Sequence, residues 1–270
     1  MPHSQPQSSL SIEDLLHLMN APLSHAMEDI SEVLRQSHRI SPSALLSARS
    51  LFTTEIFTTF LSSPSANLLL VDGHCNSQRS GNVSPLSVLC TGVTSALLQA
   101  GSGRVISFYC GEHANSDRSL AGPKGMLRSL ISQMVCTGEQ PAPPLDFLDQ
   151  SYAHALGKRD FKALLNLFET LLYWYGVRAM PSTTIYIVLD NVSEFEGSAT
   201  GYKEEMHDIV SSLRQIVWKH NNGQAQAAPR LKVLLTCAER SISLFREVDP
   251  KLEHVSLMSG IRYQGDIRLR

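Results

Sequence analysis

The chain has 270 residues, of which 43% are hydrophobic and 18% charged, and its formal net charge at pH 7 is −2. This composition is typical of a globular α/β protein, and the balanced charge gives no electrostatic reason to expect nucleic acid or a membrane surface as a partner. No apolar run approaches the roughly 18 residues that a membrane-spanning helix needs. Five scattered cysteines without C-x-x-C spacing, and no cleavable apolar leader, predict reduced thiols and a cytoplasmic location.

The amino-terminal 63 residues predict helices and no strand. Ser11 can cap a short helix with an acidic first turn, and Met27–Gln36 carries its apolar residues on one face. A third helical stretch is predicted from Ser41 to Leu61. We expect these helices to pack on the main domain as a lead-in. The expected organisation is a disordered start, a helical lead-in, a main domain and a tail, at residues 1–10, 11–63, 64–260 and 261–270.

Apolar segments typical of strands alternate with amphipathic segments typical of helices over the rest of the chain. The predicted strands are Leu68–Val71, Arg104–Cys110, Thr183–Asp190, Leu231–Thr236 and Glu253–Met258. The segments between them predict helices from Ser84 to Gly101, around Met126–Met134, from Asp160 to Leu172 and over Tyr202–Lys219, with a proline-rich break at 138–144 and a short helical turn at Ser241–Arg246. This alternation predicts an α/β fold in which helices sandwich a parallel sheet, with the first and third strands buried inside it.

The loop after the first predicted strand has the layout of a phosphate-binding loop. Residues 73–80 read G-x-x-x-x-Q-R-S, against the P-loop motif G-x-x-x-x-G-K-[ST]. Gly73, Gln78, Arg79 and Ser80 are therefore the candidate phosphate ligands, and the Ser80 hydroxyl is also a candidate ligand for Mg²⁺. Two diagnostic positions differ, because Gln78 carries a Cβ that disfavours a tight turn and Arg79 is not equivalent to a compact lysine.

The start of the following helix is also displaced from the P-loop pattern. Ser84-Pro85 is a strong start signal, with a serine N-cap and proline at the first helical position. A start near Arg79 would instead place Pro85 inside the helix, at a cost of about 3 kcal/mol. We therefore expect a loop of about eleven residues before Ser84, with Arg79 and Ser80 on a mobile segment.

Further polar residues follow the third and fourth predicted strands. A buried strand that ends in Asp190 fits a site whose carboxylate binds Mg²⁺, and Glu194 is placed to polarise an attacking water. Arg240 is a candidate sensor of a γ-phosphate. The alternative is that Asp190 caps a turn while Glu194 and Arg240 are solvated loop charges.

The order of these segments resembles the NACHT-type branch of the signalling P-loop ATPases (the STAND class), and in particular the nephrocystin-like N-terminal domains abundant in filamentous fungi. The resemblance covers roughly residues 45–245. It is carried by L-L-L-V-D-G at 68–73, S-P-L-S-V-L-C at 84–90, F-Y-C-G-E-H at 108–113 and G-P-K-G-M-L-R-S-L-I-S-Q at 122–133. It implies that Asp190 matches the magnesium aspartate and Glu194 the last acid of the family's D-G-h-D-E signature. Arg240 follows its strand at a greater distance than the family's sensor arginine.

Three functional hypotheses follow. The favoured one is a degenerate, non-hydrolysing P-loop fold that acts as a binding or regulatory module, with protein partners and weak or no binding of ATP or GTP with Mg²⁺. The second is a slow Mg²⁺-dependent ATPase or GTPase that uses Arg79, Ser80, Asp190 and Glu194. The third is a structural interaction protein without nucleotide. A metal site formed by His74, Cys75, Cys110 and His113 is not expected, because the strands that carry the two pairs should not be neighbours.

Overall fold

The computed structural model of the protein describes residues 10–115, 119–136, 143, 145–179, 183–197, 201–224 and 228–257. The disordered start predicted at residues 1–10 lies, except for Leu10, outside the described residues. The tail predicted at 261–270 and nearly all of the break predicted at 138–144 lie outside them too.

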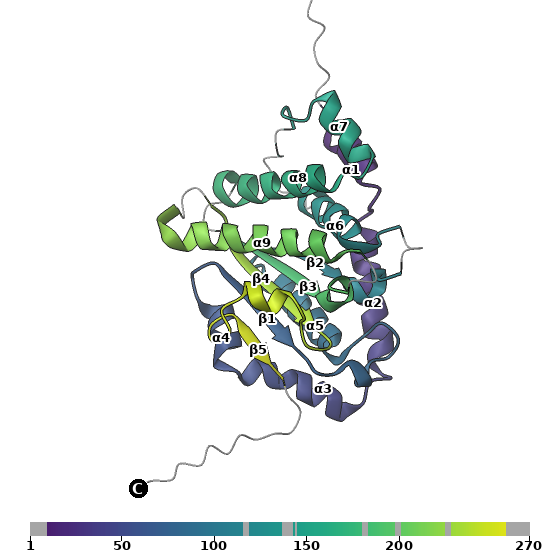
Figure 1. Cartoon of the computed structure of the whole chain (residues 1–270), viewed down its shortest axis with the longest axis vertical. Helices are drawn as coiled ribbons and strands as arrows, with labels where there is room; N and C mark the ends of the chain where they lie inside the picture. Colours follow the sequence, from purple (N-terminus) through teal and green to yellow (C-terminus); the bar gives the residue numbers. More distant parts are fainter. Residues whose placement is uncertain are drawn as a thin grey trace, which may run out of the picture.

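Five strands in the described part of the chain form one parallel sheet in the order β2-β3-β4-β1-β5 (Figure 1). The strands are β1 Asn67–Asp72, β2 Gly103–Tyr109, β3 Thr184–Asp190, β4 Arg230–Cys237 and β5 His254–Ser256. All adjacent pairs run parallel, and β3 is buried along its whole length between β2 and β4. The parallel sheet and the interior positions of β1 and β3 were predicted from sequence and are confirmed.

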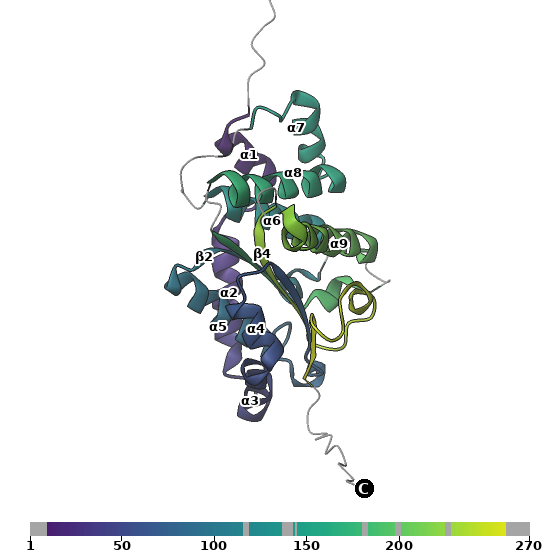
Figure 2. The same cartoon turned by 90° about the vertical axis from the view of Figure 1, so that its left-hand side faces the viewer.

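Alternate side chains of the strands enter two separate apolar layers, one on each face of the sheet. In β3, Ile187 and Leu189 point into the larger layer and Val188 into the smaller one. The larger layer is covered by α1 Ile12–Met19, α6 Gly122–Cys136, α7 Gln150–Gly157, α8 Phe161–Tyr173 and α9 Lys203–Lys219. The smaller layer is covered by α2 Ser24–Ser37, α3 Pro42–Arg49, α4 Glu55–Ser62 and α5 Pro85–Ala100. Figure 2 shows α4 and α5 on one side of the sheet and α9 on the other.

The helical lead-in is divided between the two faces of the sheet. Its first helix, α1, packs against α6 and α7, whereas α2 and α3 pack against α5 on the opposite face. Arg128 of α6 fixes the end of α1, because its buried guanidinium donates to the carbonyls of Met19 and Asn20. These carbonyls are among the groups that a helix end leaves unpaired. The lead-in is therefore part of the same packed unit as the sheet.

Local capping signals account for the helix boundaries. Ser11 forms a capping box with Asp14 at the start of α1, and the side chain of Asp160 accepts from the backbone N–H of Ala163 at the start of α8. The stretch predicted as one helix from Ser41 to Leu61 is interrupted by a 3₁₀ turn at Ser50–Thr53, after which Thr54 caps α4. The short turn predicted near 241–246 is a 3₁₀ helix at Leu244–Glu247, and α7 was not predicted.

Candidate functional site

The loop after β1 is held against the end of β4. The Gly73 N–H donates to the Cys237 carbonyl (2.8 Å) and the Cys75 N–H to the Ala238 carbonyl (2.7 Å). A Cβ at position 73 would lie 2.7 Å from the side chain of Leu86, so the space beside Gly73 is filled by protein. In a P-loop, backbone N–H groups in this position face a phosphate.

The middle of the loop folds back on itself. Asn76–Gln78 forms one 3₁₀ turn, and Ser80 and Val83 exchange two backbone hydrogen bonds around Gly81, whose φ is +58°. Gln78 does not need the positive φ that a P-loop glycine adopts, because the left-handed positions are His74 and Gly81. Six backbone N–H groups in the loop thus donate to carbonyls of the chain: those of Gly73, Cys75, Gln78, Arg79, Ser80 and Val83.

Helix α5 begins at Pro85, as its sequence predicts. The buried side chains of Ser84 and Ser87 form a capping box, in which each hydroxyl accepts from the backbone N–H of the other residue. The Leu86 N–H is directed at the Cys75 sulfur, and burial raises the pKa of that thiol to about 11. The first turn of α5, where a P-loop would bind an anion, is therefore satisfied by neutral groups of the protein itself.

Arg79 and Glu194 meet at the carboxyl edge of the sheet. Nη1 of Arg79 lies 2.6 Å from Oε1 of Glu194, and the two side chains are 18% and 25% exposed. Nη1 also donates to the Asn76 side chain (3.0 Å), and the Asn191 amide donates to the same Glu194 oxygen (3.0 Å). The loop predicted to be mobile at Arg79 is in this structure tied to the segment after β3. The proposed phosphate ligand and the proposed water-polarising acid neutralise each other.

Asp190 is buried at the end of β3, next to β4. The Thr236 hydroxyl donates to its Oδ1 (2.7 Å), and Ser87 and Cys90 of α5 lie close enough to the carboxylate to lower its pKa. These contacts lower the pKa of Asp190, but desolvation outweighs them and raises it above the ordinary value. The hydroxyl that α5 presents to Asp190 is that of Ser87, whereas Ser80 belongs to the β-bridge with Val83.

Arg240 lies at the surface beyond β4. Its guanidinium carbon is 5.7 Å from the centre of the Phe245 ring, and its side chain is exposed. No contact joins it to Arg79, Asp190 or Glu194 among the described residues. Of the candidate residues, the structure therefore brings Arg79 and Glu194 into contact and places Arg240 apart.

An acidic cavity of about 490 Å³ borders the tip of the loop at Gly81 and Asn82. It lies between α2 and the 3₁₀ turn η3, Cys110–His113, which follows β2. Its lining contains four carboxylates against one arginine: Glu28, Asp29, Glu32 and Glu112, with Arg35. A hydrogen bond between Nε2 of His113 and Oδ2 of Asp29 (2.9 Å) joins α2 to the end of β2. The negative lining is unfavourable for the phosphates of a nucleotide.

Three polar residues important for the geometry of the carboxyl edge were not predicted. Asn191, in the left-handed conformation (φ 55°), accepts from the Ala238 N–H and donates to Glu194. Ser87 could have been found as the third residue after the Ser84 cap. Glu196 is buried and accepts from the backbone N–H groups of Ser243 (2.9 Å) and Leu244 (2.8 Å), which joins the loops after β3 and β4. Nothing local in the sequence distinguishes Glu196 from a surface acid.

Two further observations concern metal binding and membrane crossing. No group of three or more His, Cys, Asp or Glu side chains is arranged there to hold a metal ion, and β1 and β2, which carry the two His/Cys pairs, are separated by β3 and β4. None of the helices in this part of the chain combines the length and apolar character needed to cross a bilayer.

Comparison with known proteins gives one family match. The family described as "Nephrocystin 3, N-terminal" matches residues 47–237, which is more than half of the chain. No curated protein and no solved structure gives a significant match. The match covers β1, the loop after it, α5, β2 and β3 with Asp190 at its end. It also covers the turn after β3 that contains Glu194, and it ends with β4. On the basis of this match, the chain belongs to the nephrocystin 3 N-terminal family.

Proposed function

We propose that this chain is a degenerate P-loop domain of the NACHT type that serves as a binding or regulatory module and does not hydrolyse nucleotide. The observation that carries the proposal is the ion pair between Arg79 and Glu194. In an active site, Arg79 would contact a phosphate and Glu194 would orient water. Here each group is the other's partner, so neither is available for the reaction until the pair opens.

The energetics of opening support weak or absent nucleotide binding. Phosphate contact would require the Arg79–Glu194 pair to separate and the N–H groups of Gly73 and Cys75 to leave their carbonyl partners. Each charge-assisted hydrogen bond contributes about 1.5–3 kcal/mol, and a neutral one about 1 kcal/mol. If the open state lies about 3 kcal/mol above the closed one, apparent affinity falls by roughly 150-fold. The acidic cavity beside the loop adds electrostatic repulsion.

Hydrolysis is tested by phosphate release from purified protein with MgATP and with MgGTP. We expect a rate equal to that of Asp190→Asn, which removes the candidate magnesium ligand, and of Glu194→Gln, which removes the candidate acid. Turnover that is present in the wild type and lost in both variants would support the slow-ATPase alternative. A double variant with Gln78→Gly and Arg79→Lys restores two motif residues, and we expect it to stay inactive because α5 still begins at Pro85.

We propose that the partner is a protein and that it contacts the lead-in. Four large apolar side chains of α2, α3 and the following turn are 46–69% exposed: Met27, Leu34, Leu46 and Phe52. A photo-crosslinking residue at position 46 should capture a protein that the same group at position 98 does not. Position 98 is the matched control, because Leu98 on α5 is equally apolar and 53% exposed. Equal capture from both positions would contradict a partner surface on the lead-in.

A further inference from the structure

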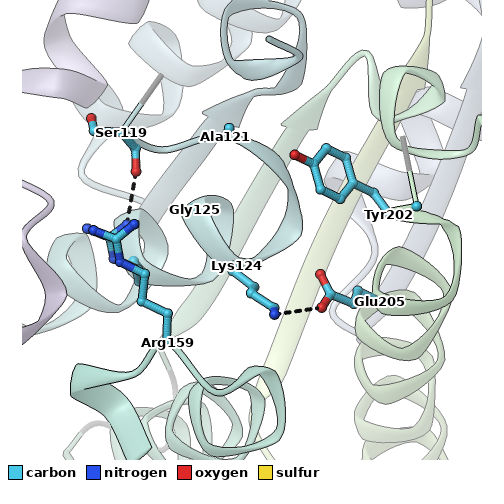
Figure 3. Close-up of a pocket in the computed structure, with 9 residues that line it drawn as sticks. Ser119, Ala121, Lys124, Gly125, Arg159, Tyr202 and Glu205 are labelled. Atoms are coloured by element: carbon cyan, nitrogen blue, oxygen red, sulfur yellow. Dashed lines mark hydrogen bonds and ion pairs between the residues drawn. The ribbon is translucent and has the colours of Figure 1, made fainter. Parts of the chain in front are cut away.

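A second cavity lies on the α6 and α9 side of the sheet, on the opposite face from α5. Its volume is about 400 Å³, within the range of small-molecule sites. It is bordered by the first turns of α6 and α9 and by the turn between α7 and α8 (Figure 3). In that view Arg159 stands across the cavity from Tyr202 and Glu205. None of the residues assigned above to the P-loop-like site lines it.

The charges that line this cavity are unbalanced. Three cations face one carboxylate, and that carboxylate, of Glu205, already pairs with Lys124 (Nζ–Oε1 3.3 Å). Among the described residues, the guanidinium of Arg159 has no hydrogen-bond or ion-pair partner. Arg159 lies in the tight turn between α7 and α8, and its backbone φ of 57° is in the left-handed region. In the part of the chain that the structure describes, the lining of this cavity therefore carries two more positive than negative charges.

Arg128 contributes one of these charges from the floor of the cavity. It is buried, and its described hydrogen bonds run to neutral carbonyls, those of Met19, Asn20 and Ser119. Burial, together with repulsion from Arg159, lowers the pKa of Arg128 to about 10. Burying a cation without an anion costs free energy, because neutral dipoles offset only part of its desolvation. An anion bound beside it would lower that cost.

The helix field reinforces the positive potential. The first turn of α6 contains no acidic residue and carries Lys124, although the positive end of a helix dipole favours an acid there. Lys124 at this position is unfavourable for the stability of α6 alone. Its ion pair with Glu205 connects the first turn of α6 to the first turn of α9.

We propose that this cavity binds the phosphate group of a small phosphorylated molecule. Arg159 and Arg128 supply the uncompensated charge, and Lys124 and the first turn of α6 lie beside the anion. A phosphate monoester carries nearly two negative charges at pH 7, which matches the two uncompensated cations, whereas a carboxylate carries one. The volume exceeds that of the anion and leaves space for a sugar-sized group beside the Tyr202 ring. This site is separate from the P-loop-like loop, so it does not depend on the proposed function.

Isothermal titration with ribose 5-phosphate at constant ionic strength tests the proposal, with ribose and inorganic phosphate as matched probes. We expect 1:1 binding of ribose 5-phosphate with Kd below about 1 mM, weaker binding of inorganic phosphate and none of ribose. Arg159→Gln should weaken binding by about tenfold or more, because it removes a charge-assisted hydrogen bond. Lys158→Gln removes the same charge one residue away, outside the cavity, and should change Kd less than twofold. Glu205→Gln should tighten binding.

The opposite outcomes are distinct. No saturable binding to the wild type at 10 mM (about ten times the expected Kd limit) would overturn the site, and equal losses in Arg159→Gln and Lys158→Gln would show only general electrostatic attraction. Inorganic phosphate that binds as tightly as ribose 5-phosphate would overturn the organic part of the ligand. Circular dichroism should be used to check that each variant is folded. Arg79→Gln, which alters the P-loop-like loop, should leave the Kd unchanged.

Discussion

Arg79 and Glu194 are 115 positions apart in sequence, and their side chains form an ion pair at 2.6 Å that joins the loop after β1 to the segment after β3. The pair is largely shielded from water, so we expect a larger coupling energy than for a surface pair. In a double-mutant cycle with Arg79→Gln and Glu194→Gln, the coupling in the free energy of unfolding should be about 1–2 kcal/mol. Urea denaturation measures it. Strictly additive single effects would mean that the pair does not hold the loop.

Nucleotide should stabilise the protein little. A competent site with affinity near 10 µM would, at millimolar MgATP, raise the Tm of a domain of this size by about 5–10 °C. We expect a shift of less than about 2 °C in differential scanning fluorimetry, since the loop must first release its own hydrogen bonds. A shift above about 5 °C that is absent in Arg79→Ala would contradict the closed loop. A shift that is absent only in Arg159→Gln would instead locate the phosphates at the second cavity.

Two glycines on either side of the start of α5 should respond in opposite directions to the same change. At Gly73 a Cβ would lie 2.7 Å from Leu86 and 3.0 Å from the Cys237 carbonyl, so Gly73→Ala should destabilise the protein by about 1–3 kcal/mol. At Gly92, inside α5, a Cβ meets nothing within 4 Å, and Gly92→Ala should stabilise by about 0.5–1 kcal/mol. Thermal or urea unfolding compares the two. Destabilisation by Gly92→Ala as well would contradict the open space beside Gly92.

Lys232 of β4 gives a prediction for the pH dependence of stability. Its side chain is 2% exposed and donates to the Phe60 carbonyl (2.6 Å), and burial lowers its pKa to about 8. The unfolded chain, with an ordinary lysine pKa of about 10.4, holds its proton between these values while the native state has lost it. Stability should therefore rise with pH across this window, by up to about 3 kcal/mol from this group.

Urea unfolding of the wild type and Lys232→Met at pH 7.5 and 10 isolates the effect. Buried thiols such as Cys75, whose pKa is raised to about 11, act in the opposite direction but are present in both proteins. The stability of the wild type relative to Lys232→Met should increase by about 2–3 kcal/mol between the two pH values. Lys251→Met, which changes an exposed lysine, should show no such increase. A constant difference for Lys232→Met would mean that its amine titrates normally.

Local sequence signals were sufficient for much of the fold and for little of the site. The strand Thr184–Asp190 follows from a continuous β-branched run, and the start of α5 follows from Ser84-Pro85. The pairing of Arg79 with Glu194 depends on the order of strands in the sheet, in which only β4 separates β1 from β3. The role of Glu196 likewise arises only when the loops after β3 and β4 meet. Contacts of this kind have no periodic pattern in the chain.

The division of the lead-in between the two faces of the sheet defines what can fold as one cooperative unit. The family match begins at residue 47, inside α3, whereas Leu15 and Met19 of α1 are fully buried and Arg128 ends on the carbonyls of Met19 and Asn20. A fragment cut at that boundary would expose an apolar groove along α6 and leave a cation without its acceptors. The segment that sequence comparison recognises is therefore shorter than the smallest segment expected to unfold in a single transition.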